Sequence, residues 1–162
     1  MAKKSYNEKL RHSADLPKVE NIAGTKQAER LKAQTMLIAA PLEYDALMKR
    51  VPPGRLITID RLMAFLATQH GADIACPMTA GIFVNIAAHA NEERLGVDET
   101  PYWRTLKKGG ELSEKYPGGL IGHQQKLEAE GHTVTQRGKR LFVQDYADKL
   151  HEFGGERRDD RG

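Results

Sequence analysis

The chain has 162 residues, of which 40% are hydrophobic and 29% are charged, and its formal net charge is +3. This length suits one compact domain with tails and is short for two independent domains. The isoelectric point near 9.0 allows contact with phosphates, but the net charge is small beside that of many nucleic-acid binders, so charge alone supports a DNA-binding role only weakly.

The cysteine and histidine content argues against several kinds of site. Cys76 is the only cysteine, which excludes an intramolecular disulfide and makes a cysteine-based zinc site a poor hypothesis. Motifs for a phosphate-binding loop and for a serine-hydrolase elbow are missing as well. We expect no metal site and no cofactor, because the following histidines lack any familiar ligand spacing: His70, His89, His123, His132 and His151.

The sequence gives no sign of membrane association or export. Its basic N-terminus is followed by polar and charged residues instead of the apolar core of a signal peptide. No apolar stretch approaches the length needed to cross a bilayer. We therefore expect a soluble protein of the reducing cytoplasm that contacts no membrane.

The amino-acid composition along the sequence divides the chain into three parts. Residues 1–35 are rich in lysine and sparsely apolar, which is typical of a basic arm with one short helix, either partly disordered or laid against the domain. Such an arm can contact DNA phosphates or remain a solvated tail. Residues 36–153 are expected to form the domain, and residues 154–162 a mobile charged tail.

The domain is expected to open with a short apolar run and a helix. Residues 36–39 form the run, and Pro41 then sits at a favourable position in a first helical turn. Leu42, Leu47 and Met48 would face inward until the chain breaks at residues 52–54.

Two further helices with a tight connection form a helix-turn-helix candidate. Thr58 is a good N-cap for a helix over 59–69, since its hydroxyl can accept from amides of the first turn, and Gly71 marks the stop. The second helix should start near Pro77 and fade in the charged residues 91–94.

The second helix has one large apolar side and one side of small residues. A projection at 100° per residue predicts a core face formed by Met78, Ile82, Ile86 and His89. Small side chains let a helix approach another surface closely, and that surface could be a DNA groove or the N-terminal segment. The small residues of the opposite face are Ala80, Gly81, Val84, Ala88 and Asn91.

The C-terminal half is expected to contain an extended segment, a loop, a third helix and a hairpin. Residues 101–106 have extended character, and Gly109 and Gly110 mark a turn, followed by a loop over 116–119. Residues 121–129 form the third helix, which Gly131 closes.

A hairpin and a last helix should complete the domain. Residues 133–135 and 140–143 are strand-like and flank a turn that contains Gly138. Asp145 can cap a last helix that runs to about His151. A hairpin in this place would form the wing of a winged helix-turn-helix domain, with an α+β and mainly helical fold class.

Three segments together resemble the DNA-binding domain of the O6-alkylguanine-DNA alkyltransferases. They are the tetrad Pro101–Arg104, the glycine pair Gly118 and Gly119, and residues 127–131, which read Leu-Glu-Ala-Glu-Gly. In that family the tetrad reads Pro-Cys-His-Arg. The similarity runs from about residue 51 to about residue 134 and implies a scaffold that binds double-stranded DNA and recognises alkylated guanine.

The chain departs from the family at the residues that carry its chemistry. Tyr102 and Trp103 stand where the family has the nucleophilic cysteine and the histidine base, and a phenol is a poor nucleophile at neutral pH. Ile59 replaces a tyrosine that acts on phosphate, and Gly81 replaces the arginine that fills the base stack. The pattern is similar to that of alkyltransferase-like proteins and implies DNA binding without alkyl transfer, in the cytoplasm at the nucleoid, with a repair protein as a further partner.

The resemblance gives two sets of candidate site residues. The implied lesion pocket comprises Pro101, Tyr102, Trp103, Arg104, Gly118, Gly119 and Glu130. The candidate DNA contacts are Thr58, Thr79, Ala80, Gly81, Val84, Lys126, Arg137 and Lys139.

Other interpretations of these residues remain open. Arg104 could form a structural salt bridge, and Tyr102 with Trp103 could simply fill the core. The scaffold could instead be a protein-interaction module that uses the small face of the second helix. A thiol-dependent enzyme is the third alternative, in which Cys76 is the nucleophile, His70 the base and Asp73 its orienter.

Overall fold

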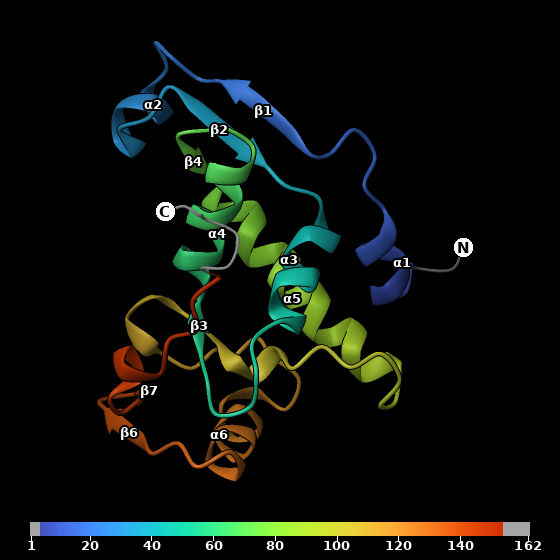
Figure 1. Cartoon of the computed structure of the whole chain (residues 1–162), viewed down its shortest axis with the longest axis vertical. Helices are drawn as coiled ribbons and strands as arrows, with labels where there is room; N and C mark the ends of the chain where they lie inside the picture. The colour runs from blue at the N-terminus through green and yellow to red at the C-terminus, as the bar shows by residue number, and fades with distance from the viewer. Residues whose placement is uncertain (1–3, 154–162) are drawn as a thin grey trace.

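The computed structural model describes residues 4–153. A small sheet lies at one end of the molecule (Figure 1). The sheet order is β1-β2-β4, in which β1 pairs antiparallel with β2 and β2 pairs parallel with β4. Residues 4–35 are therefore laid against the domain and supply one of its strands. The elements of this layer are β1 (Lys18–Asn21), α2 (Lys26–Leu31), β2 (Thr35–Ile38) and β4 (Ile74–Ala75).

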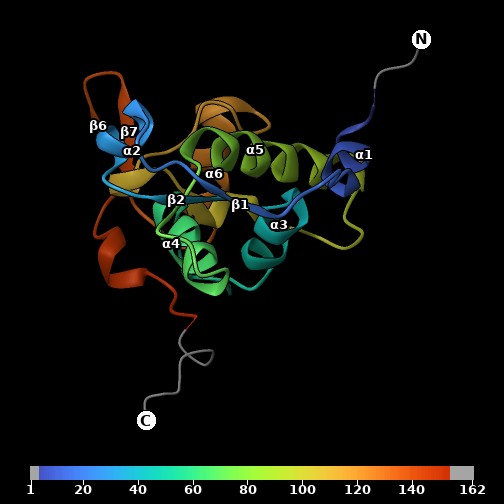
Figure 2. The same cartoon turned by 90° about the horizontal axis from the view of Figure 1, so that it is seen from above.

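The first helix, α1 (Tyr6–Arg11), is held against the C-terminal end of the long helix α5 (Pro77–Glu93), as Figure 2 shows. The Glu93 carboxylate accepts hydrogen bonds from the backbone N–H groups of Tyr6 and Asn7, at 2.8 and 3.0 Å. These two amides lie in the first turn of α1 and have no partner within the helix, so Glu93 complements the capping box that Ser5 forms with Glu8. Leu10 is buried in the main core.

The centre of the molecule is a layer of helices made of α3 (Pro41–Lys49), α4 (Ile59–Gln69) and α5 (Figure 1). The bounds of α4 match the prediction, and Gly71 adopts a φ of 71° just beyond its end. Pro41 occupies the first turn of α3, whose Leu47 and Met48 are buried as expected. Leu42 is exposed instead, and Thr58 precedes α4 without a side-chain cap bond.

The assignment of the two faces of α5 was wrong. Met78 and Ile82 were expected in the core and are 71% and 48% exposed. The side of small residues is the buried one, because small side chains let α5 lie close to α1, α3 and α4. The fully buried residues of this helix are Ala80, Val84, Ala87, Ala88 and Ala90.

The other end of the molecule carries the tetrad and α6 (Gly119–Ala129) (Figure 1). The segment was expected to be extended, but Tyr102–Arg104 form a single 3-10 turn, η1. The next two residues form β5 (Thr105–Leu106), which pairs parallel with β3 (Ile57–Thr58). The backbone of the tetrad is thus bent just before β5 begins, so the directions of the tetrad side chains differ from those in an extended strand. A second short turn, η2, spans Lys108–Gly110.

The predicted hairpin is present as β6 (Val134–Arg137) and β7 (Arg140–Val143), paired antiparallel. The expected last helix is only a 3-10 turn, η3 (Tyr146–Lys149), and Asp145 makes no cap bond. The ring of Tyr146 packs where a Cβ at Gly110 would stand, so this glycine lets η3 close on the turn. The mixed α+β class is confirmed, whereas the role of the hairpin as a wing remains a prediction.

Within residues 4–153, no helix is long and apolar enough to span a membrane. The expected charged tail, residues 154–162, lies outside the described residues.

Candidate nucleic-acid interface

A hollow of about 390 Å³ lies beside the exposed face of α5. One wall is this helix, with Met78, Gly81, Ile82 and Asn85, and Ile59 at the start of α4 adds a further apolar side chain. The remaining residues come from the segment between β5 and α6, so three elements far apart in the sequence meet here. These residues are Lys107, Ser113, Glu114 and Lys115.

A second hollow of about 430 Å³ extends this surface toward the β6–β7 hairpin. The two hollows share Lys107 and Glu114, and the second is also lined by Lys139 and Arg140. We call the joint surface the groove face. Its charged residues are four cations, Lys107, Lys115, Lys139 and Arg140, and two carboxylates, Glu111 and Glu114.

Ion pairs fix part of the groove face. Arg140 donates two hydrogen bonds to the carboxylate of Glu111, at 3.0 and 2.8 Å. Lys107 lies 3.7 Å from both Glu111 and Glu114. The Arg140 hydrogen bond, together with the charges of Lys107 and Arg140, lowers the pKa of Glu111 although partial burial opposes the shift. The hairpin is thereby tied to the segment that lines both hollows.

The tyrosine of the tetrad is buried in the core and does not line the groove face. Tyr102 is 1% exposed, and its ring packs edge-on against Trp103 and Tyr116 with both centroids 5.2 Å away. Burial raises the pKa of Tyr102, and the charge of Glu92 raises it further. The phenol therefore stays neutral and cannot act as a nucleophile at physiological pH. Since Pro101 and Trp103 are buried as well, the expected lesion pocket at the tetrad is closed in this structure.

Arg104 and Glu130 form a nearly buried ion pair. The guanidinium donates through Nε and Nη2 to the carboxylate at 3.0 and 2.6 Å, and through Nη1 to the Val51 carbonyl at 2.8 Å. Partial burial raises the pKa of Glu130, but the hydrogen bonds and the charge of Arg104 lower it more. Arg104 thus joins the segment after α3 to the end of α6, and this is the structural salt bridge that the sequence analysis left open as an alternative.

His123 connects the tetrad to the groove face, a role that no motif in the sequence indicated. It lies buried on α6; its Nε2 is 2.9 Å from the Trp103 carbonyl, and its Nδ1 accepts from the Ser113 N–H at 3.1 Å. These partners require a neutral ring with the proton on Nε2. Burial accordingly lowers the pKa of His123 to about 4.

The structure separates the expected DNA contacts into buried and accessible residues. Thr58, Ala80 and Val84 are buried and cannot touch DNA, which corrects these three assignments. Of the cations, Lys126 lies 4.6 Å over the Trp103 ring and Arg137 lies 3.9 Å over the Phe142 ring. Thr79, half-buried, donates to the Cys76 carbonyl.

Gly81 and Lys139 are the expected DNA contacts that line the groove face, while Gly118 and Gly119 line neither hollow. Sequence reasoning missed Met78, Ile82, Asn85, Lys107 and Lys115 as surface residues. The helical spacing of Met78 and Ile82 showed that the two side chains lie on the same side of α5. We assigned that side to the core because large apolar side chains are usually buried, and this assignment was wrong.

The arrangement around Cys76 does not support a thiol-dependent site. The thiol is buried against Ile22 and Met36. His70 Nε2 lies 2.6 Å from Glu43 Oε1, and Asp73 accepts from the backbone N–H groups of Gln34 and Thr35. The proposed base and its orienter are thus engaged with other groups.

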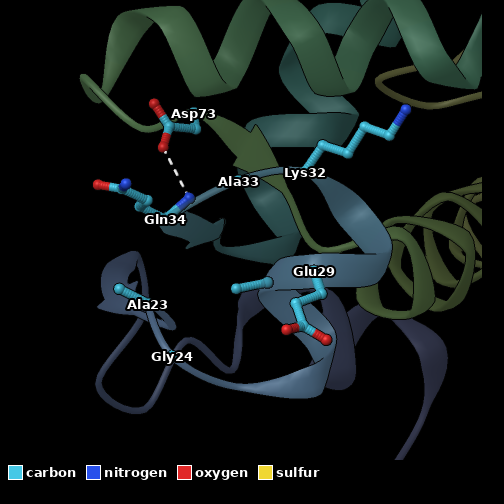
Figure 3. Close-up of a pocket in the computed structure, with 8 residues that line it drawn as sticks. Ala23, Gly24, Glu29, Lys32, Ala33, Gln34 and Asp73 are labelled. Atoms are coloured by element: carbon cyan, nitrogen blue, oxygen red, sulfur yellow. Dashed lines mark hydrogen bonds between the residues drawn. The ribbon is translucent and has the colours of Figure 1, made fainter.

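A further hollow, of about 780 Å³, lies beside α2 in the N-terminal layer (Figure 3). Figure 3 shows the Asp73 carboxylate bonded to the Gln34 N–H, while the side chain of Lys32 extends away from both Asp73 and Glu29. In the part of the chain that the structure describes, no three His, Cys, Asp or Glu residues gather as metal ligands. The carboxylates of Glu29 and Asp73 in this hollow therefore do not belong to such a set.

The layered helices, the paired β3 and β5 and the hairpin after α6 form a fold that is also found among solved structures. Among solved structures it is similar to S. pombe ATL, which was crystallised in complex with DNA, with a TM-score of 0.52 and 17% sequence identity. The match covers 69% of this chain and 94% of that one. The structure of S. pombe Atl1 with damaged DNA containing O6-carboxymethylguanine has a TM-score of 0.48, 16% identity and the same two coverages. No protein-family model and no curated protein matches the chain.

Proposed function

We propose that this protein binds double-stranded DNA without altering it chemically, through the groove face. The observation that carries the proposal is the exposed apolar side of α5, which lies beside the four cations of the groove face. Lysine and arginine side chains can contact phosphates, and a helix can enter a DNA groove. A fold shared with a protein crystallised on DNA supports this choice of partner.

The side chains of the tetrad support a role without catalysis at the family site. Tyr102 is buried and neutral, and Trp103 offers no base. We further propose that alkylated guanine is among the targets and that the bound protein directs another repair pathway, with a repair protein as partner. Such a role places the protein in the cytoplasm at the nucleoid.

A fluorescence anisotropy titration tests this function directly. Labelled duplexes with and without O6-methylguanine are titrated at moderate salt; binding to both, tighter to the alkylated one, is the expected result. A protein-interaction module would bind neither duplex. Mass spectrometry of the protein recovered from the alkylated duplex should show an unmodified chain, whereas a methyl adduct on Cys76 would establish transfer to that thiol.

The charge-reversed variant Lys139→Glu should bind DNA with a weaker dependence on salt. Removing one phosphate contact lowers the slope of log K against log salt by about 1. The control Lys32→Glu carries the same charge change outside the groove face and should leave the slope unchanged. Equal slopes for Lys139→Glu and wild type would remove the hairpin from the interface.

A further inference from the structure

The first two turns of α5 present two large apolar side chains to solvent. Met78 is 71% exposed and Ile82, one turn later on the same side, is 48% exposed. Between them Gly81 has no side chain, and a Cβ there would meet nothing within 4 Å. The pair therefore projects from a helix whose other side is locked in the core.

The surroundings of this pair match a DNA groove in their chemistry. Ile59 and Asn85 continue the surface into the 390 Å³ hollow, which Lys107 and Lys115 also line, with Glu114 as the one carboxylate. The first turn of α5 contains no acidic residue, so its positive dipole end is not neutralised there. Methionine is enriched and lysine is depleted in protein–protein interfaces, so the two lysines, and not the apolar pair, favour DNA over a protein partner.

We propose that Met78, supported by Ile82, enters the minor groove as an apolar wedge between neighbouring base pairs. This inference rests on the proposed DNA-binding function. Proteins that bind the minor groove often insert methionine or isoleucine between base steps, which unstacks and kinks the duplex. A methionine side chain is unbranched and flexible, so it adapts to an irregular gap.

The wedge defines the class of target. Unstacking costs least where a base pair is already mismatched or damaged. Tyr102 and Trp103 line neither hollow, so the groove face reads the ease of opening and not the alkyl group itself. Duplexes with a G·T mismatch and duplexes with O6-methylguanine should accordingly be bound alike, and both more tightly than an intact duplex.

The experiment uses duplexes in which 2-aminopurine stands beside an intact pair, a G·T mismatch or an O6-methylguanine. Wild type should increase the 2-aminopurine fluorescence of the two weakened duplexes, because the wedge unstacks the probe. Met78→Ala should lose this increase and bind the weakened duplexes about tenfold less tightly, which corresponds to the loss of about 1.4 kcal/mol. Ile121, also 71% exposed but on α6, provides the control Ile121→Ala, which should behave like wild type.

The outcomes distinguish this inference from the function on which it rests. Binding by wild type with an undiminished fluorescence increase in Met78→Ala would overturn the wedge and leave the DNA-binding function standing. Binding to O6-methylguanine but not to the G·T mismatch would overturn the target class. Failure of wild type to bind any duplex would overturn both. Melting curves that agree for the three proteins show that folding is unaffected.

Discussion

Replacement of Arg104 by alanine is expected to lower the free energy of unfolding by about 3 kcal/mol, as measured by urea denaturation at pH 7. The side chains of Arg104 and Glu130 are only 11% and 16% exposed. Removing the guanidinium leaves a carboxylate with little access to water and without its partner. It also leaves the Val51 carbonyl without the donor that Arg104 supplies.

A second arginine–carboxylate pair provides a matched control for this prediction. Arg140 also donates two hydrogen bonds to one carboxylate, that of Glu111, but its side chain is 63% exposed. Because solvent screens the Arg140 guanidinium and Lys107 remains 3.7 Å from the Glu111 carboxylate, Arg140→Ala should lower the free energy of unfolding much less than Arg104→Ala. Equal losses in the two variants would show that burial does not govern the strength of the Arg104 pair.

The bounds of the helices could be predicted because their signals are local. Pro41 and Pro77 occupy first turns, where a proline loses no helical hydrogen bond, and Gly71 ends α4 with a positive φ. These signals act within a few residues of each other. Sequence alone was therefore sufficient to place α3, α4 and α5.

The orientation of α5 could not be predicted in the same way. The projection placed Met78 and Ile82 in the core, and it grouped Gly81, which lies between them on the groove face, with the small residues that are buried. In the structure the small side chains are buried instead, because Ala80, Ala87 and Ala88 let neighbouring helices approach closely. Met78 remains exposed. Large apolar residues on a surface are themselves an indication of binding, so this error concealed the candidate site.

The positions of the tetrad and of the groove face depend on contacts between distant residues. The 3-10 turn at Tyr102 is followed by a strand that pairs with β3, almost fifty residues earlier in the chain. Likewise, the hollow beside α5 is lined by Ile59 and by Lys107, which are far apart in the sequence. Pairings of this kind leave no periodic trace in the sequence, so only the structure brings these residues together.

His123 is expected to make the protein less stable as the pH falls from about 6.5 to about 4. Burial lowers the pKa of the folded-state imidazole from 6.5 to about 4. In this range the unfolded chain binds the proton and the folded protein does not, so the free energy of unfolding falls with pH. The stabilisation is fully present above 6.5, and about 3 kcal/mol of it is lost at about 4. Urea denaturation at a series of pH values measures the slope.

The variant His123→Gln isolates this contribution from those of other titrating groups, which include His132 and Glu130. A glutamine can accept from the Ser113 N–H and donate to the Trp103 carbonyl, yet it does not titrate. The difference between wild type and variant should therefore change by about 1.4 kcal/mol per pH unit between 6 and about 4.5. Parallel profiles would mean that the ring is protonated in the folded protein. In that case a proton on Nδ1 would face the Ser113 N–H, and His123 could not hold the groove face to the tetrad as the structure shows.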